Sequence, residues 1–190
     1  MLLAIAALLA AVAVGAVVVE KRRWLEPDHS LDRLTQVKPS MVPGAGNGLF
    51  AAMPIVNDTL VAELGGRLID FAESGDLQHR ALLPECGKQA EAYCCLEAKV
   101  GGGPGAMINF APRAVNGVDL GLQNVRLESF CRRPYLGFFA VRDIATGEEL
   151  FTSYGKKGEY DYAFMELPAV KRFFCARPGV DCRERYDWEP

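Results

Sequence analysis

Several signals of common function classes are missing from this chain of 190 residues. It has no Cys-x-x-Cys pair and only two histidines, so it lacks the spacing of a structural zinc site. No Gly-Lys-Ser/Thr completes a phosphate-binding loop. The net charge of −3 gives no general attraction to nucleic acid, which usually needs a basic face. We therefore expect neither a bound metal nor direct contact with nucleic acid.

Cysteines are present but scattered. The six are Cys86, Cys94, Cys95, Cys131, Cys175 and Cys182. The side chains of the neighbours Cys94 and Cys95 would point to opposite faces of a strand. We expect reduced, mostly buried thiols. A secreted, disulfide-linked domain is the alternative.

The composition is that of a globular protein. Half of the residues are hydrophobic and 24% are charged, which suits one domain with a sizeable core, with or without an appendage. Repeats are absent, and many short apolar segments predict a mostly β domain with short helices. In one of these segments, 122–130, apolar and polar residues alternate, and Val125 and Leu127 are expected to face inward.

The N-terminal segment is apolar. Residues 2–19 carry no charge, and their number is at the lower edge of the roughly 17–25 that span a bilayer. Glu20-Lys21-Arg22-Arg23-Trp24 follows, with three positive charges and an interfacial aromatic ring. This pattern predicts an apolar helix that anchors the chain in a membrane, with the rest on the cytosolic side. A cleaved targeting segment is the main alternative. Residues 1–24 form this anchor or targeting segment, and the polar residues 25–40 read as a linker.

Three later segments carry candidate chemistry. PGAGNGLFA, residues 43–51, has three glycines within five positions, which permits positive φ and close approach of a ligand to the backbone. Residues 107–111 form an apolar piece around one polar residue, Asn109. In 135–155, an apolar strand, a Gly turn and a short strand end in Tyr154-Gly155. Such an arrangement delivers one phenol to a fixed place.

In this order the three segments resemble the SET domain, the fold of many protein lysine methyltransferases. FFAVRDIATGEELFTSYG is similar to the family's closing signature, PGAGNGLFA to its opening motif, and residues 107–111 to its Asn-His element with Phe110 at the His position. The resemblance covers about 42–155. It implies small curved β-sheets around a pseudoknot in a catalytic domain over 41–160, followed by a helical C-terminal extension over 161–190.

The resemblance also implies site residues. Gly46, Asn47, Gly48, Asn109 and the main chain of Phe110 would contact the methyl donor, S-adenosyl-L-methionine. Tyr154 takes the place of the catalytic tyrosine, which would direct the lone pair of the substrate amine. Aromatic side chains suit the wall of the lysine channel, and Tyr93 is the candidate there. Trp188, near the end of the chain, is expected to lie in a frayed terminus.

The function implied is an S-adenosylmethionine-dependent protein-lysine N-methyltransferase, tethered through residues 2–19 and acting on a histone or non-histone protein. The donor is an intracellular metabolite, which favours a membrane protein with a cytosolic domain. The alternative is a catalytically impaired SET-like binding or scaffold module. Two departures support it: Phe110 replaces the family's His, and only Cys175 and Cys182 lie where many members carry a zinc-binding tail.

Overall fold

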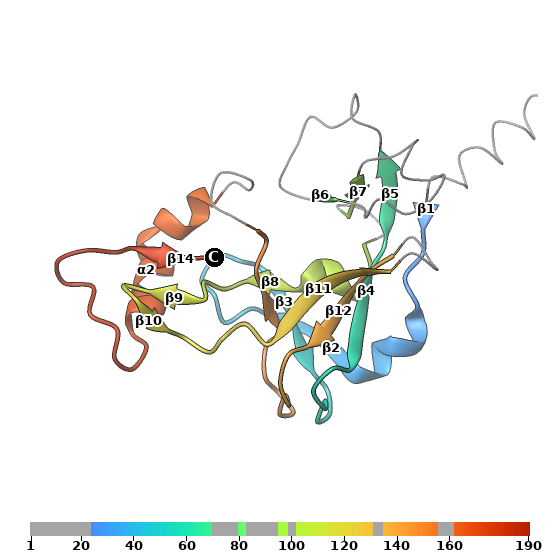
Figure 1. Ribbon diagram of the computed structural model, residues 1–190, viewed down its shortest axis with the longest axis horizontal. Coiled ribbons are helices and arrows are strands. Elements are labelled where there is room, and N and C mark those ends of the chain that lie inside the picture. Colours follow the sequence, from blue (N-terminus) through green and yellow to red (C-terminus); the bar gives the residue numbers. More distant parts are fainter. Residues whose placement is uncertain (1–23, 70–79, 83–94, 99–101, 131–134, 156–161) are drawn as a thin grey trace, which may run out of the picture.

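The computed structural model describes residues 24–69, 80–82, 95–98, 102–130, 135–155 and 162–190 (Figure 1). The apolar helix expected over residues 2–19 and the channel candidate Tyr93 lie outside these ranges. Within them, no helix combines the length and apolar character needed to cross a membrane.

Strands dominate the described residues, and the helices are short. The strands are β1 (Trp24–Leu25), β2 (Thr35–Pro39), β3 (Asn47–Ala51), β4 (Leu60–Leu64), β5 (Gly66–Ile69), β6 (Arg80–Leu82), β7 (Cys95–Glu97), β8 (Asn109–Phe110), β9 (Ala114–Val115), β10 (Val118–Asp119), β11 (Val125–Phe130), β12 (Tyr135–Ala140), β13 (Phe151–Thr152) and β14 (Trp188–Glu189). The helices are η1 (His29–Leu34), η3 (Pro104–Met107), η4 (Ala163–Glu166) and α2 (Pro168–Cys175). The expected class, mostly β with short helices, is confirmed.

The described strands form several small sheets (Figure 1). One antiparallel sheet has the order β11-β12-β4, a second has the order β1-β5-β7-β6, and a third has the order β10-β9-β14. Strands β2 and β3 form an antiparallel pair, and β13 and β8 a parallel one. The site described below lies where this parallel pair meets the loop before β3.

Strand β12 is central in its sheet, with β11 on one side and β4 on the other. Leu136, Phe138 and Ala140, which share one face of the strand, are all buried. Strand β11 pairs with β12 and is the outermost strand of the sheet. Val125 at its start is buried, as expected, but the inward position expected for Leu127 is wrong: this residue is 38% exposed. An edge strand has less of the core to cover its side chains.

The parallel pair joins two remote parts of the chain. Phe151 lies opposite Asn109 and Thr152 opposite Phe110. Asn124 secures this crossing from inside the core, since its Nδ2 donates to the Glu149 carbonyl at 2.9 Å. Its Oδ1 accepts a hydrogen bond from the Phe151 N–H at 2.9 Å. The Asn109 segment is therefore held against the chain just before Tyr154.

Residues 25–40, expected as a linker, contribute to the folded domain. Helix η1 begins after Asp28, whose carboxylate accepts from the Ser30 N–H and caps it. Strand β2 then pairs with β3 along its whole length, from Thr35 to Pro39. The polar composition of this segment reflects a solvated strand face, because the residues of β2 after Thr35 are partly or fully exposed.

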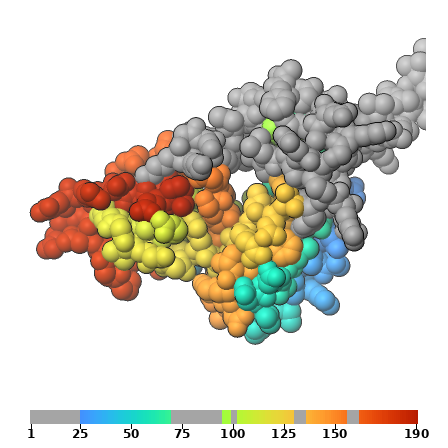
Figure 2. Space-filling view, in the orientation of Figure 1, coloured from blue at the N-terminus to red at the C-terminus, as the bar shows by residue number. Residues whose placement is uncertain are grey.

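Two hydrophobic clusters meet at β8. The first packs beneath β3, β4 and β12 and includes Ile108. The second contains Phe110, Phe151 and Trp188 and lies beside the C-terminal segment, which Figure 2 shows in red next to the yellow residues around β9 and β10. Since Ile108 and Phe110 belong to different clusters, Asn109 sits at the seam between them.

Candidate active site

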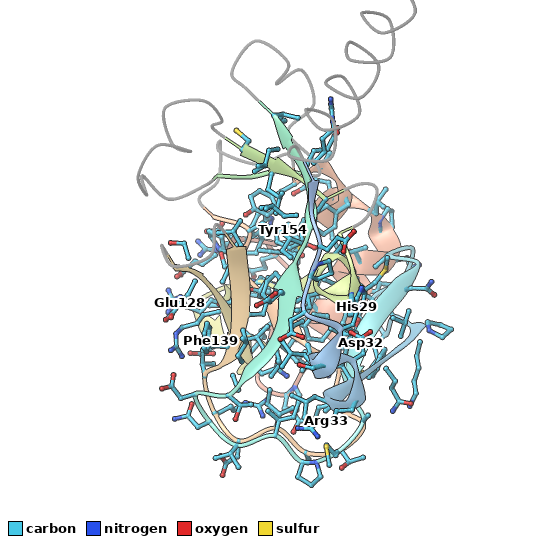
Figure 3. The ribbon with its side chains drawn as sticks, turned by 90° about the vertical axis from the view of Figure 1, so that its right-hand side faces the viewer. His29, Asp32, Arg33, Glu128, Phe139 and Tyr154 are labelled. Atoms are coloured by element: carbon cyan, nitrogen blue, oxygen red, sulfur yellow. A yellow bond between two sulfur atoms is a disulfide. The ribbon has the colours of Figure 1, made fainter. Side chains whose placement is uncertain are left out.

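One cavity brings the three sequence motifs together. It has a volume of about 230 Å³. Its lining residues are Val42, Pro43, Gly44, Ala45, Asn109, Phe110, Tyr154, Phe164, Leu167 and Val170. They come from the loop before β3, from β8, from the chain after β13, and from η4 and α2. Figure 3 shows Tyr154 over the centre of the molecule, while Glu128 and Arg33 lie toward its periphery.

Tyr154 is held at this cavity by a hydrogen bond to the main chain. Its hydroxyl donates to the Ile108 carbonyl at 2.9 Å, and its ring centroid lies 5.7 Å from that of Phe110. The parallel register of β13 against β8 places Thr152 opposite Phe110, and the Tyr154 side chain reaches back along β8 to the carbonyl of Ile108, the residue just before that strand. With its proton directed at a carbonyl, the phenol presents oxygen lone pairs to other partners.

Asn109 is oriented by two acceptors. Its Nδ2 donates to the Asn47 carbonyl at 3.0 Å and to Glu149 Oε1 at 3.1 Å. No described residue donates a hydrogen bond to its Oδ1. The side chain therefore offers the cavity an acceptor.

The glycine loop uses its glycines in two ways. Gly44 and Gly46 have φ values of +82° and +72°, a left-handed conformation that favours glycine. Gly48 is required for space, since a Cβ there would lie 2.1 Å from Glu149 Oε1. Gly44 and Ala45 line the cavity, whereas the predicted donor-contact residues 46–48 lie just beyond its described lining. Asn47 still takes part, through its carbonyl contact with Asn109.

Phe110, at the position where the family pattern has His, is a core residue. It is 2% exposed, and its ring lies 4.8 Å from that of Tyr162 and 5.6 Å from that of Trp188, centroid to centroid. The expectation of a frayed terminus at Trp188 is wrong. This residue is 6% exposed, and as part of β14 it pairs with Val115 of β9. The apolar ring of Phe110 provides the surface on which Trp188 packs.

A disulfide closes the C-terminal segment. Cys175 and Cys182 are bonded, with their Cα atoms 5.8 Å apart, and Cys95 is also disulfide-bonded. The expectation of reduced thiols is therefore wrong for the cysteines in the described ranges. The chain turns back after α2 and brings Cys182 within the reach of about 4.4–6.8 Å that a disulfide requires. The part of the chain that can be described contains no cluster of metal-ligating side chains.

Asn116 holds the same segment from the other side. Its Nδ2 donates to the carbonyls of Asp181 and Arg185, and its Oδ1 accepts from the Asp187 N–H. Asn116 has a φ of +50°, one of the left-handed positions that Asn tolerates. The helical extension expected over 161–190 is helical only as far as Cys175 within the described residues.

Two ionisable groups near the site have shifted pKa values. Burial acts to raise the pKa of Glu148, but hydrogen bonds from Arg142 and from the Ala145 N–H outweigh it, so the pKa is lowered. The pKa of Tyr186 is raised, first by burial and then by the charge of Glu166. Neither group lines the cavity.

Sequence reasoning missed the far wall of the cavity. Phe164 lines it from η4, Val170 from α2, and Leu167 from the extended residue between the two helices. Because the three residues do not share one helix, no helical period in the sequence marks them as one surface. Glu149 was also missed as a site residue, since in the sequence it stands out only as part of the segment FFAVRDIATGEELFTSYG.

Comparison with known proteins identifies the fold. The SET domain model matches residues 46–155. The methyltransferase domain of human PR domain-containing protein 2 is 17% identical, with a TM-score of 0.52, and the match covers 66% of this chain and 80% of that one. At this identity the likeness establishes the fold alone.

Two further similar structures are of polycomb repressive complex 2. In one, bound to S-adenosylmethionine, identity is 25%, the TM-score is 0.50, and the match covers 64% of this chain and 15% of that chain. For the complex from Chaetomium thermophilum, identity is 26% and the TM-score is 0.51, and the match covers 65% of this chain and 15% of that chain. This chain thus spans a small part of those proteins. No curated protein matches the sequence. Since the family model covers more than half of the chain, from the glycine loop to the residue after Tyr154, this protein belongs to the SET domain family.

Proposed function

We propose that this protein is an S-adenosylmethionine-dependent protein-lysine N-methyltransferase. The observation that carries the proposal is the single cavity lined by the glycine loop, Asn109 and Tyr154. Members of the SET family methylate lysine, and one similar structure is bound to S-adenosylmethionine.

The residues of the cavity suit this donor. S-adenosylmethionine supplies a methyl group activated by a sulfonium, and it carries an ammonium, a carboxylate and an adenine. Asn109 Oδ1 is an acceptor for the ammonium. Phe164, Leu167 and Val170 provide apolar surface for the adenine. The left-handed turn at Gly44 lets the main chain approach the ligand closely.

Tyr154 would orient the acceptor amine. A lysine must arrive neutral to have a lone pair, although its ordinary pKa is about 10.4. Desolvation in a narrow channel favours the neutral amine. The phenol oxygen, whose own proton goes to the Ile108 carbonyl, can accept an amine N–H and direct the lone pair toward the methyl group. Tyr93 remains the proposed channel residue on sequence grounds.

The substrate we propose is a lysine side chain of another protein, either a histone or a non-histone protein. A net charge of −3 supports attraction to a basic protein segment rather than to nucleic acid.

The test is binding followed by turnover. Calorimetry of the purified chain with S-adenosylmethionine is expected to give a one-site isotherm. Incubation with labelled donor and a lysate of its own cells is expected to label protein on lysine. Binding without any labelled lysine would contradict the enzyme assignment.

A scaffold role is the second candidate. The observation that favours it is Phe110, whose buried ring cannot make the polar contacts of a His side chain. Its main chain still pairs with β13, so a main-chain contact to the donor is compatible with this residue. Absence of any heat or thermal shift with S-adenosylmethionine would favour the scaffold.

We also propose that residues 2–19 tether the domain to a membrane, with the domain in the cytosol. The positive charges after this segment and the intracellular donor support this side. The Cys175–Cys182 disulfide supports a domain on the opposite, non-cytosolic side of the membrane, since disulfides persist mainly in oxidising compartments. Protease digestion of sealed membranes decides: a cytosolic domain is degraded without detergent, and a luminal one is protected.

A further inference from the structure

We infer that Glu149 is a positioning residue: it fixes the Asn109 amide so that the cavity selects ligands with a positively charged amino group. This inference rests on the proposed function, because it concerns how the same cavity recognises the amino-acid end of its ligand.

Glu149 is a buried carboxylate that does not itself line the cavity but contacts Asn109, which does. It is 2% exposed. Its Oε1 accepts from the Ser40 hydroxyl at 2.6 Å and from Asn109 Nδ2 at 3.1 Å, and its Oε2 accepts from the Met41 N–H at 2.7 Å. The carboxylate thus joins the chain before the glycine loop, strand β8 and the segment that leads to Tyr154.

An amide has a donor end and an acceptor end, whereas an ionised carboxylate only accepts. Glu149 and the Asn47 carbonyl are both acceptors, and both face Asn109 Nδ2. A flipped amide would set its oxygen against two other oxygens and lose two hydrogen bonds. Glu149 and the Asn47 carbonyl together therefore set the orientation of Asn109 with Oδ1 left for a ligand, and Glu149 is the one of the two that carries a charge.

The charge of Glu149 acts in the same direction. No described Lys or Arg forms an ion pair with it. A buried anion next to the cavity attracts a cation more strongly than an exposed one, because water screens it less. Because Gly48 has no side chain, it leaves room for the carboxylate: a Cβ at this position would lie 2.1 Å from Glu149 Oε1.

The test compares two ligands. S-adenosylhomocysteine has the ammonium, and 5′-methylthioadenosine has the adenosine and sulfur but no amino-acid end. In Glu149→Gln, one carboxylate oxygen becomes an amide donor and the negative charge is lost, while the Asn47 carbonyl remains as an acceptor for Asn109. We expect the affinity for S-adenosylhomocysteine to fall by about 10- to 100-fold, the range of a charge-assisted hydrogen bond. The affinity for 5′-methylthioadenosine is expected to stay within about 3-fold, because it makes no contact with the amide.

Glu148→Gln is the matched control, because it makes the same chemical change one residue earlier, at a carboxylate that is bonded to Arg142 and the Ala145 N–H rather than to Asn109. It is expected to leave both affinities unchanged. Ser40→Ala removes one donor from the same carboxylate oxygen and disturbs the fold less. It is expected to lower only the S-adenosylhomocysteine affinity, by about 2- to 5-fold.

The outcomes separate the two proposals. If the wild-type protein binds neither ligand, the proposed function fails. If the wild type binds S-adenosylhomocysteine but every folded variant keeps the wild-type ratio of the two affinities, or loses both affinities equally, the role of Glu149 is overturned. Thermal unfolding of each variant identifies those that are folded.

Discussion

The hydroxyl of Tyr154 has one donor and two acceptor lone pairs, and the donor is committed to the Ile108 carbonyl. The phenol is thereby fixed at the cavity wall by the residue that directly precedes Asn109 and strand β8. The amide and the phenol are set on neighbouring stretches of main chain, so small movements of β8 would displace both. Orientation of reacting groups is worth several kcal/mol, which makes this shared support important for turnover.

Replacing Tyr154 with Phe removes the oxygen and keeps the ring. We expect kcat for lysine methylation to fall by at least about 100-fold, the scale of a lost orienting or polar catalytic group. Affinity for the donor is expected to change little. Single-turnover assays with labelled donor and calorimetry measure the two quantities.

Tyr162→Phe is the control, because Tyr162 is buried and donates to the Gly155 carbonyl at 2.7 Å without lining the cavity. It is expected to retain kcat within a few-fold and to lose about 1 kcal/mol of stability. Equal losses of kcat in the two variants would contradict the assigned role of Tyr154.

Glu148 gives a pH prediction at the same scale. Because its folded pKa is lowered, it contributes stability above its ordinary value of 4.5, and this contribution is lost as pH falls through the folded pKa. Glu148→Gln is therefore expected to be less stable than wild type at pH 7, with the difference shrinking below about pH 4. Urea midpoints measured from pH 3 to 7 check this. A difference that grows at low pH would have the wrong sign.

At the scale of elements, Asn124 holds the chain that leads into β13. This residue is 1% exposed, and both ends of its amide bond to the main chain of the segment 149–151. No repeated or local pattern announces such a contact, since the bonded groups lie 25 and 27 residues away.

We expect Asn124→Ala to lower the free energy of unfolding by about 2–4 kcal/mol, since two buried hydrogen bonds are lost and main-chain groups are left unpaired. Urea denaturation measures the change. Gln123→Ala is the neighbouring control: its amide makes one half-buried contact, with the Ala111 carbonyl, and a loss of about 1 kcal/mol is expected. A larger loss at Gln123 than at Asn124 would refute the role given to Asn124.

The Cys175–Cys182 disulfide gives a prediction for the C-terminal segment. Alkylation of the unfolded, unreduced protein is expected to leave both cysteines unmodified, as mass spectrometry would show. Serine at both positions is expected to lower stability by about 2–3 kcal/mol, the chain-entropy estimate for so short a loop. Reductant should destabilise the wild type more than this double variant. Full alkylation without reductant would rule the disulfide out.

At the scale of the whole molecule, the cavity exists only in the folded chain, so a ligand that fills it must stabilise the fold. S-adenosylmethionine at 100 times its Kd is expected to add about 2.7 kcal/mol of stability. For a chain of this size, that corresponds to a rise in Tm of about 5–10 °C. Differential scanning fluorimetry measures it, with adenosine at the same concentration as the control. An unchanged Tm at saturating donor would favour the scaffold alternative.

The sequence predicted the class, the β12 strand and the three motifs that meet at the cavity, because each of these is a local pattern. It did not predict the positions of Trp188 or Leu127, since burial there depends on what packs against a segment. Glu149 escaped notice for the same reason: its partners Ser40 and Met41 are remote in the sequence. The lining by Phe164, Leu167 and Val170 was not predicted, because these residues come from two helices and the residue between them.

The separation between Glu149 and Ser40, 109 positions, also bears on how a ribosome makes this protein. At about 5–20 residues per second, the glycine-rich stretch emerges about 5–20 s before its anchor has been translated. During that interval a nascent chain lacks the carboxylate that joins Ser40, Met41 and Asn109. Competence to bind a methyl donor is therefore acquired late in biosynthesis, and an mRNA truncated upstream of codon 149 yields a product without it.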